Sequence, residues 1–394
     1  MILSARWVFP VSQPPIENGW VAITGERISA IGPADGTIPD LDLGDAALLP
    51  GLVNAHTHLD LCGARGCTPP QSDFTTWLES VIAWRMQISP HNLLEDITTG
   101  LSDLIRSGTT LVGDIAHTGH SSSVLAASPI NSVVYRELLG LTQPRAESAW
   151  HDVSSWIVSQ EKSNRRTLGL SPHAPYSVHR SLLELAGQSG LPLAIHFAES
   201  EHERELLEEH SGPFVSFLKK RGVWDPHGLV PSHRFIWEQI TGHATTVLVH
   251  ANYPPHDFQP GQNSCVVYCP RTHAAFGHPA HPFRDYLHAG INVGLGTDSL
   301  ASNPDLDLWA EVQFLRRQEP DFPPAQLLRM ATLNGARALG WDHDTGSLEA
   351  GKYADILVLP FEVSTGDDPS SALLDSSWPE FGKRRSMWHG QWRY

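Results

Sequence analysis

The 394-residue sequence has little positive charge. It contains 27 lysines and arginines against 43 aspartates and glutamates, which gives a formal net charge of −16 at pH 7. Binding to nucleic acid depends on clustered lysine and arginine, and an anionic membrane surface also attracts such clusters. The charge balance therefore argues against both kinds of partner.

Long hydrophobic runs are also missing. No segment reaches the roughly 18 uninterrupted apolar residues of a transmembrane helix, so none is expected. The first residues, MILSARWVFPVSQPP, lack the basic segment, apolar core and cleavage site of a secretory signal peptide. Hydrophobic residues make up 41% of the chain and charged residues 18%, as in globular proteins. We predict a cytoplasmic protein.

Cysteine is scarce, and several familiar motifs are absent. The four cysteines form no Cys-x-x-Cys pair, so neither a disulfide framework nor a zinc ribbon is expected. The sequence has no GxGxxG that opens a helix, no GxxxxGKS/T, no GxSxG and no HExxH. The HxE and PCxxC motifs of one class of zinc deaminase are absent too. These absences leave little support for nucleotide-binding, serine-hydrolase or zincin chemistry.

From residue 49 onward, short apolar runs rich in β-branched residues alternate with stretches of helical length, such as 91–108 and 181–190. Continuous apolar runs between helices are typical of parallel strands that are covered on both faces. Eight such units predict a (β/α)8 TIM barrel over residues 49–344. The predicted strands are 48–58, 109–117, 132–141, 167–175, 191–200, 245–253, 264–273 and 291–299.

The two ends of the chain have a different pattern. Residues 1–48 and 345–394 contain short strand-like segments joined by glycine and proline turns. We predict that these two ends pair into one small β-sandwich domain beside the barrel. Within the second end, residues 362–380 are the most loop-like.

The first predicted barrel strand ends in NAHTHLDL, which places His56 and His58 one residue apart. Side chains at positions i and i+2 of a strand point to the same face, so the two imidazoles converge on one point. This pair suits a metal ion, whereas an apolar core would leave two polar rings unsatisfied. Other strands would have to supply the remaining ligands.

Polar residues also end several other predicted strands. In a TIM barrel the chemistry lies at the C-terminal ends of the strands. Any one of these residues could simply begin a loop, but so many histidines and acids at one end of the barrel predict a shared site. They are His173 on the fourth strand, His196 and Glu199 on the fifth, His250 on the sixth, and Asp298 with Ser299 on the eighth.

The motifs HTH, HFAE, VHA and GTDS, in this order, resemble those of the amidohydrolase superfamily. SPHAPYSV and GSLEAGKYADILVL resemble the branch of cytosine deaminase, adenosine-derivative deaminases and triazine chlorohydrolases. The resemblance implies one divalent ion per chain, held by His56, His58, His196 and Asp298. Relatives with two metals carry a carboxylated lysine after the fourth strand, and this chain has none there. Zinc is the expected metal, although such ligands also accept iron or manganese.

The resemblance further implies a hydrolytic deaminase. A bound metal lowers the pKa of its water toward about 7, and Asp298 can accept the proton. Glu199 can pass a proton to a ring nitrogen, and His250 can stabilise the tetrahedral intermediate. The expected substrate is a purine base or a 6-amino-purine nucleoside derivative, for example one similar to aminodeoxyfutalosine. A chlorohydrolase or another amidohydrolase acting on a related ring stays open, as does a non-catalytic barrel scaffold.

Five residues are expected to contact the substrate: His173, Trp77, Arg136, Arg271 and Ser299. His173 resembles the family residue that touches a purine-like ring, and Trp77 lies where relatives place a pocket-lining loop. Several adenosine-derivative deaminases hold the ribose with a glutamate about nine residues after that tryptophan, where this chain has Arg85 and Met86. Arg136 and Arg271 would contact an acidic group of the substrate. We expect a small heterocyclic partner, no nucleic acid and no membrane, with a homodimer left open.

Overall fold

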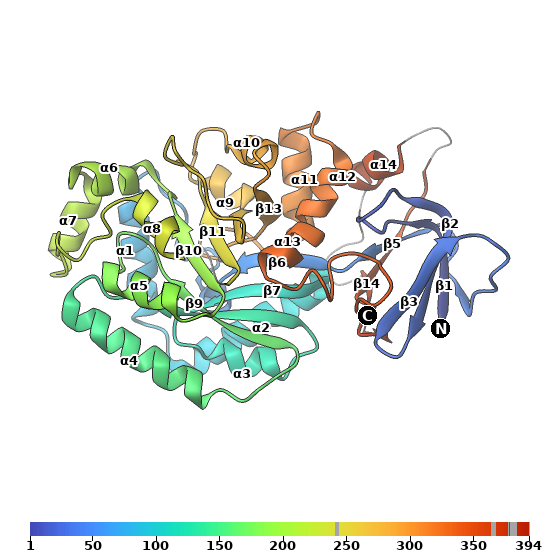
Figure 1. Ribbon diagram of the computed structural model, residues 1–394, viewed down its shortest axis with the longest axis horizontal. Coiled ribbons are helices and arrows are strands. Elements are labelled where there is room, and N and C mark those ends of the chain that lie inside the picture. The colour runs from blue at the N-terminus through green and yellow to red at the C-terminus, as the bar shows by residue number, and fades with distance from the viewer. Residues whose placement is uncertain (241–243, 364–367, 377, 379–383, 394) are drawn as a thin grey trace.

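The computed structural model of the chain describes residues 1–240, 244–363, 368–376, 378 and 384–393. Figure 1 shows a barrel of strands wrapped by helices and, beside it, a smaller β domain that contains both termini. The helix-covered barrel confirms the predicted (β/α)8 fold, and the separate sheet confirms that the two ends of the chain pair with each other.

The barrel sheet contains eight parallel strands that follow one another in chain order. It closes through a bridge between Thr57 and Asp298, beside a hydrogen bond of 3.1 Å from the Asp298 amide to the His56 carbonyl. The first and last strands therefore meet where two predicted metal ligands lie. The strands are β6 (Leu52–Thr57), β7 (Thr109–Ala116), β8 (Asn131–Leu138), β9 (Arg166–Pro172), β10 (Leu193–Phe197), β11 (Thr246–His250), β12 (Ser264–Tyr268) and β13 (Asn292–Leu295).

Helices cover the outside of this barrel (Figure 1). Helix α2 shows how the sequence sets their ends: the Ser89 hydroxyl accepts from the Asn92 amide at its start, Pro90 is its first residue, and Gly108 ends it with φ 90°. The helices are α1 (Phe74–Arg85), α2 (Pro90–Ser107), α3 (Ser121–Ala126), α4 (Gln143–Ser159), α5 (Arg180–Gln188), α6 (Glu201–Glu209), α7 (Pro213–Lys220), α8 (His233–Ile240), α9 (Pro270–Ala275), α10 (Phe283–His288), α11 (Leu308–Gln318), α12 (Pro324–Met330) and α13 (Leu333–Ala338), with a 3-10 turn η1 (Leu59–Ala64).

Both ends of the chain build the second sheet. Its strands form one mixed sheet in the order β16-β15-β14-β5-β1-β2-β3, with β4 paired to β1. Strand β14 pairs antiparallel with β5, so a C-terminal segment lies against an N-terminal one. Only Gly51 separates β5 from barrel strand β6. The strands are β1 (Ile2–Val8), β2 (Ile16–Thr24), β3 (Arg27–Pro33), β4 (Leu41–Asp42), β5 (Ala46–Pro50), β14 (Ile356–Pro360), β15 (Arg385–Trp388) and β16 (Gln391–Trp392).

One segment differs from the prediction. Residues 362–380 include helix α14 (Pro369–Asp375), which begins where the Asp368 carboxylate accepts a hydrogen bond of 2.8 Å from the Ser371 amide. The rest of the stretch, at 364–367, 377 and 379–380, lies outside the described residues. The four cysteines are free thiols, as expected. No helix in the described part of the chain is both long and apolar enough to cross a membrane.

Candidate metal centre and substrate cavity

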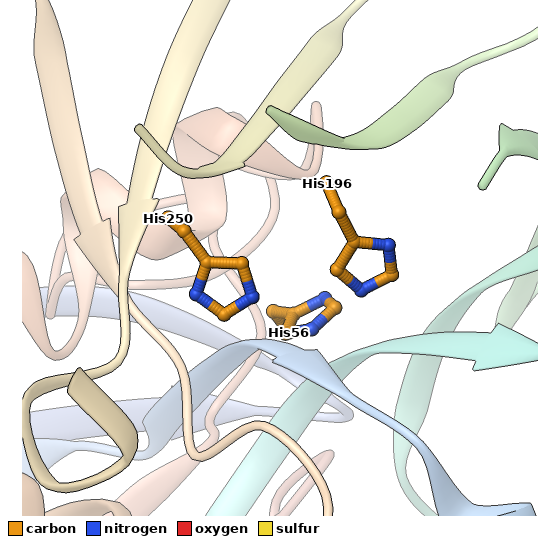
Figure 2. Close-up of side chains that lie close together, drawn as sticks. All are labelled: His56, His196 and His250. Carbon is orange, nitrogen blue, oxygen red and sulfur yellow. The ribbon is translucent and has the colours of Figure 1, made fainter. Parts of the chain in front are cut away.

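Four side chains from the C-terminal ends of β6, β10 and β13 converge inside the barrel mouth. One oxygen of Asp298 lies 3.5 Å from Nε2 of His56 and 3.6 Å from Nε2 of His58. Nε2 of His58 lies 3.2 Å from Nε2 of His196. Figure 2 shows the rings of His56 and His196 with that of His250, which ends β11. All five side chains are buried.

Three ring nitrogens in this cluster lack hydrogen-bond partners among the described residues. Within the described residues, both nitrogens of His56 and Nε2 of His250 are buried and make no hydrogen bond. Nδ1 of His196 donates to the His173 carbonyl at 2.8 Å, which leaves its Nε2 without a proton in the neutral ring. Buried polar atoms without partners are costly, so this donor set fits a divalent cation.

The protonation states agree with a metal site. Burial lowers the pKa of His196 to about 3 and lowers the pKa of His58 well below its usual range, so both rings are neutral, as metal binding requires. Burial also opposes the charge of Asp298, but the nearby imidazoles of His56, His250 and His58 outweigh it. The net pKa of Asp298 lies below its usual range. The cluster thus combines neutral imidazoles with one carboxylate.

The backbone at this site adopts an uncommon conformation. Asp298 has φ 58° and His250 has φ 71°, in the left-handed region that non-glycine residues rarely occupy. The Thr57 hydroxyl donates to the Asp298 carbonyl at 3.0 Å, and Nε2 of His281 donates to the His250 carbonyl at 2.7 Å. The Ser302 hydroxyl also donates to the Asp298 carboxylate at 2.9 Å. These bonds hold two strained strand ends in place.

Glu199 lies beside the cluster, just after β10. One of its carboxyl oxygens is 3.3 Å from Nε2 of His250, without the geometry of a hydrogen bond. Burial raises the pKa of Glu199 well above its usual range, and the nearby Asp298 and Glu203 add to the shift. The shift favours the protonated form of the carboxyl group, which is the form that can donate a proton.

A cavity of about 540 Å³ opens in front of the cluster. It brings together eight of the predicted site residues, while His56 lies behind its wall. Apolar side chains make up much of the remaining lining, including those of helix α1. The predicted residues in the lining are His58, Trp77, His173, His196, Glu199, His250, Asp298 and Ser299. Trp77 is buried there, and its ring nitrogen donates to the Thr68 carbonyl at 3.0 Å.

The structure does not bring Arg136 or Arg271 to the cavity, and we correct that expectation. Arg136 points out of the barrel and donates to the backbone carbonyls of His117 and Glu137. Arg271 is held by the carboxylates of Asp305 and Glu311 at 2.7 and 2.6 Å. Neither side chain lines the cavity. Both arginines have structural partners instead.

Polar side chains without a predicted site role also line the cavity, among them Glu137, His117, Arg145, Ser177, Arg221 and Arg85. The signal for Glu137 was present, because residues of β8 alternate between the two faces of the strand. Val133 and Tyr135 fill the barrel interior, so Glu137 continues the inward face and Arg136 faces outward.

Comparisons with known proteins agree with the geometry. A model of the amidohydrolase family matches residues 47–384. A 5-methylthioadenosine/S-adenosylhomocysteine deaminase of Moorella thermoacetica is 32% identical over 378 residues, which cover 89% of this chain and 83% of that protein. A 5′-deoxyadenosine deaminase of Methanothermobacter thermautotrophicus is 30% identical over 390 residues, covering 92% and 86%. The solved structure of Helicobacter pylori aminofutalosine deaminase with methylthio-coformycin has a TM-score of 0.86 at 24% identity, covering 100% of both chains.

Proposed function

The chain belongs to the amidohydrolase family, and from this premise we propose that it is a metal-dependent hydrolytic deaminase of an adenosine derivative. The observation that carries the proposal is the buried carboxyl group of Glu199, which lines the cavity 3.3 Å from Nε2 of His250, beside the cluster of histidines and Asp298. The names of the deaminases that are 32% and 30% identical to the chain support the same reaction and substrate class.

We propose that His56, His58, His196 and Asp298 hold one divalent ion, with zinc as the expected metal. The unpartnered ring nitrogens of His56 and the approach of the Asp298 carboxylate to two histidines support this set. When bound, such an ion acts as a Lewis acid that makes water a nucleophile at neutral pH.

The other steps belong to side chains of this chain. Asp298 takes the proton of the attacking water through its carboxylate. Glu199 gives its carboxyl proton to the ring nitrogen beside the amino-bearing carbon, which makes that carbon more electrophilic. His250 stabilises charge on the attacked carbon's substituent. Asp298 then passes its proton to the amino group, which leaves as ammonia, and the hydroxyl proton of the adduct returns to Glu199, so that the ring keeps an oxygen in place of the amino group.

The substrate ring would lie between the metal ligands and His173. The His173 ring lines the cavity, and its Nδ1 is fixed by a contact of 2.7 Å with the Ser177 hydroxyl, which leaves Nε2 for the ligand. Trp77 and Ser299 would complete the pocket around the ring. We place no substrate contact on Arg136 or Arg271.

A screen for ammonia release tests the reaction. The panel contains adenosine, 5′-deoxyadenosine, methylthioadenosine, S-adenosylhomocysteine, adenine, guanine, cytosine and pterins, with 6-amino-purine nucleosides that bear a carboxylated aromatic ring. We expect ammonia from at least one adenosine derivative, and close to one divalent ion per chain by elemental analysis. Chloride release from triazines without ammonia from any heterocycle would overturn the deaminase proposal.

The variant Glu199→Gln separates an enzyme from a binding scaffold. We expect it to keep the fold and the metal while kcat falls by about 10²–10⁴-fold, because it removes a positioned proton donor. Glu201→Gln, two residues away on the exposed start of α6, is the matched control and should retain activity. Unchanged turnover in the Glu199 variant would exclude that residue from the mechanism.

A further inference from the structure

A second polar group lies in the same cavity, on the far side of His173 from the metal ligands. Its centre is the carboxylate of Glu137, which ends the inward face of β8 and is buried. Nδ1 of His117 donates to Oε2 of Glu137 at 2.5 Å, and the Arg85 guanidinium lies 3.8 Å from the same oxygen. All three side chains line the cavity.

The two oxygens of Glu137 differ in their partners. His117 and Arg85 both approach Oε2, whereas Oε1 accepts no hydrogen bond from any residue that the structure describes. Nε2 of His173 lies 3.8 Å from Oε1, and this distance is too long for a hydrogen bond. Oε1 is thus directed at the cavity beside the residue that we place against the substrate ring.

A buried carboxylate is costly unless its oxygens receive hydrogen bonds. Here Arg85 and His117 supply the positive and polar partners that keep the group ionised, and Arg85 is itself held by Asp60 at 3.3 Å. The free oxygen is left for a ligand. A carboxylate accepts hydrogen bonds and donates none, so it selects hydroxyl or amino donors and repels phosphate or carboxylate groups.

The position of Glu137 Oε1 beside the proposed site of the substrate ring indicates which substrate group donates the hydrogen bond. Oε1 lies beside His173 and outside the metal cluster, where the substituent on the ring would lie, and the cavity lining also includes the apolar Leu78, Val81 and Ile82 of α1. We infer that Glu137 accepts hydrogen bonds from the sugar hydroxyls of a ribonucleoside substrate. It is therefore a specificity-determining residue that favours ribonucleosides over free bases and over analogues without those hydroxyls; this inference rests on the proposed deaminase function.

The test compares adenosine with 2′,3′-dideoxyadenosine in the wild-type enzyme and in Glu137→Gln. Loss of a hydrogen bond to a charged group costs about 10- to 100-fold in kcat/KM. We expect the wild type to prefer adenosine by that factor. Glu137→Gln should lower kcat/KM for adenosine by a similar factor, chiefly through KM, and leave the dideoxy analogue within about threefold. The preference should then nearly vanish.

Two controls accompany this variant. Glu147 lies on the exposed surface of α4, so Glu147→Gln should keep the wild-type preference for adenosine over its dideoxy analogue. Metal content and the urea unfolding midpoint of Glu137→Gln show whether the centre and the fold persist. Binding of inosine, the expected product, should weaken in Glu137→Gln while binding of hypoxanthine does not, which is a readout independent of turnover.

The outcomes separate this inference from the proposed function. A wild type that deaminates adenosine and its dideoxy analogue equally would overturn the role of Glu137 and leave the deaminase proposal intact. An equal loss on both substrates in Glu137→Gln would overturn it too, because it would show a general positioning role. Failure of the wild type to release ammonia from any heterocycle would overturn the proposed function, and the inference with it.

Discussion

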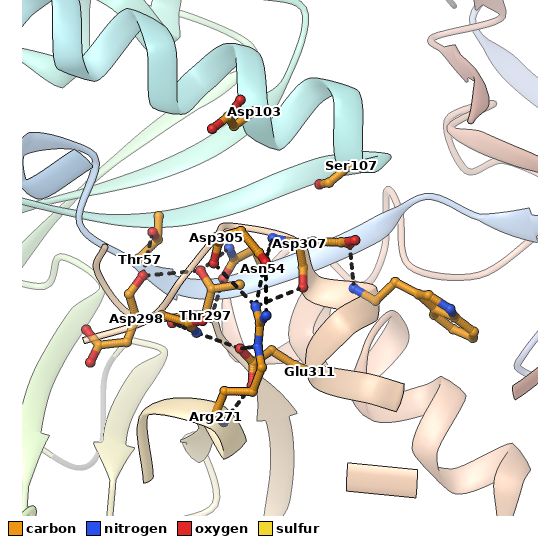
Figure 3. Close-up of polar contacts among 12 residues, drawn as sticks. Asn54, Thr57, Asp103, Ser107, Arg271, Thr297, Asp298, Asp305, Asp307 and Glu311 are labelled. Atoms are coloured by element: carbon orange, nitrogen blue, oxygen red, sulfur yellow. Dashed lines mark hydrogen bonds and ion pairs between the residues drawn. The ribbon is translucent and has the colours of Figure 1, made fainter. Parts of the chain in front are cut away.

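Two charged clusters lie on either side of the Thr297–Asp298 segment, and they differ in how their polar atoms are satisfied. On one side are His56, His58 and His196 with Asp298, where both ring nitrogens of His56 lack hydrogen-bond partners among the described residues. On the other side lies Arg271 with Asp305 and Glu311, a group whose charges are paired within the chain (Figure 3).

The second cluster holds the first in position. Nδ2 of Asn303 donates to the Thr297 carbonyl and to Glu311, both at 2.6 Å. The Asn54 side chain donates to the Thr297 hydroxyl at 2.8 Å and accepts from the Thr297 amide at 3.1 Å. The contrast teaches how buried charge can be interpreted: a fully paired group supports the backbone, whereas an unpaired one indicates where a ligand is required.

The largest expected effect is on the unpaired cluster. Asp298→Asn should remove most of the bound metal and reduce kcat/KM by at least the ~10²–10⁴-fold that loss of a positioned proton acceptor costs. Asparagine tolerates the left-handed backbone at this position, so the metal-free variant should unfold at nearly the same urea concentration as metal-free wild type. Elemental analysis, steady-state kinetics and urea unfolding measure the three quantities. Full metal content in the variant would contradict the ligand set.

A substitution in the paired cluster should lower the stability of the fold and leave turnover almost unchanged. Arg271→Met leaves Glu311, which is fully buried, without its cation, and breaking a buried pair costs about 3–5 kcal/mol in the free energy of unfolding. The kcat of the folded, metal-loaded variant should stay within about threefold of wild type, because Arg271 does not line the cavity.

A control for this prediction is the exposed pair of Lys220 and Glu79, which meet at 2.8 Å on the surface. Lys220→Met should change the free energy of unfolding by only about 0–1 kcal/mol. Urea unfolding of both variants gives the comparison. A strong loss of kcat in Arg271→Met at unchanged stability would return that arginine to the substrate site.

The smallest expected effect concerns a third buried acid, Asp355, which has hydrogen-bond donors. Its carboxylate accepts from the His389 amide at 3.0 Å and the Thr345 hydroxyl at 3.2 Å. Burial raises its pKa to about 7, although these bonds oppose the shift. Because the folded state then binds more protons than the unfolded state between about pH 4 and 7, this group's contribution to stability falls as pH rises through that window.

Replacement of this acid should flatten the pH dependence. In Asp355→Asn, the change in unfolding free energy between pH 5 and pH 7 should be less negative than in wild type, by on the order of 1 kcal/mol per pH unit at most. Urea unfolding at the two pH values measures it. Equal slopes in the two proteins would show that Asp355 is ionised throughout.

The barrel could be predicted from the sequence because eight apolar runs alternate with stretches of helical length, and its site because several of these runs end in a histidine or an acid. Periodicity does not show which long side chain finds an internal partner, so Arg271 was predicted at the cavity although it lies between Asp305 and Glu311. Helix α14 was missed because its seven residues carry too little periodicity, and only the Asp368 cap indicates it. Glu137 had no predicted role because the neighbouring Arg136 offered the positive charge expected opposite an acidic group. The alternation of side chains along β8 nevertheless places Glu137, and not Arg136, on the inward face of the strand.

The pairing of β5 with β14 has a consequence for biosynthesis. Strand β6, which carries His56 and His58, follows β5 after one residue, and β5 obtains its antiparallel neighbour from residues 356–360. A ribosome must therefore add about 300 more residues after the two histidines before that neighbour exists, and Asp298 also emerges late. At ~5–20 residues per second, the nascent chain spends many seconds with its first proposed ligands made and the rest of the centre missing. If these four side chains hold the ion, the complete site forms only after translation of the barrel.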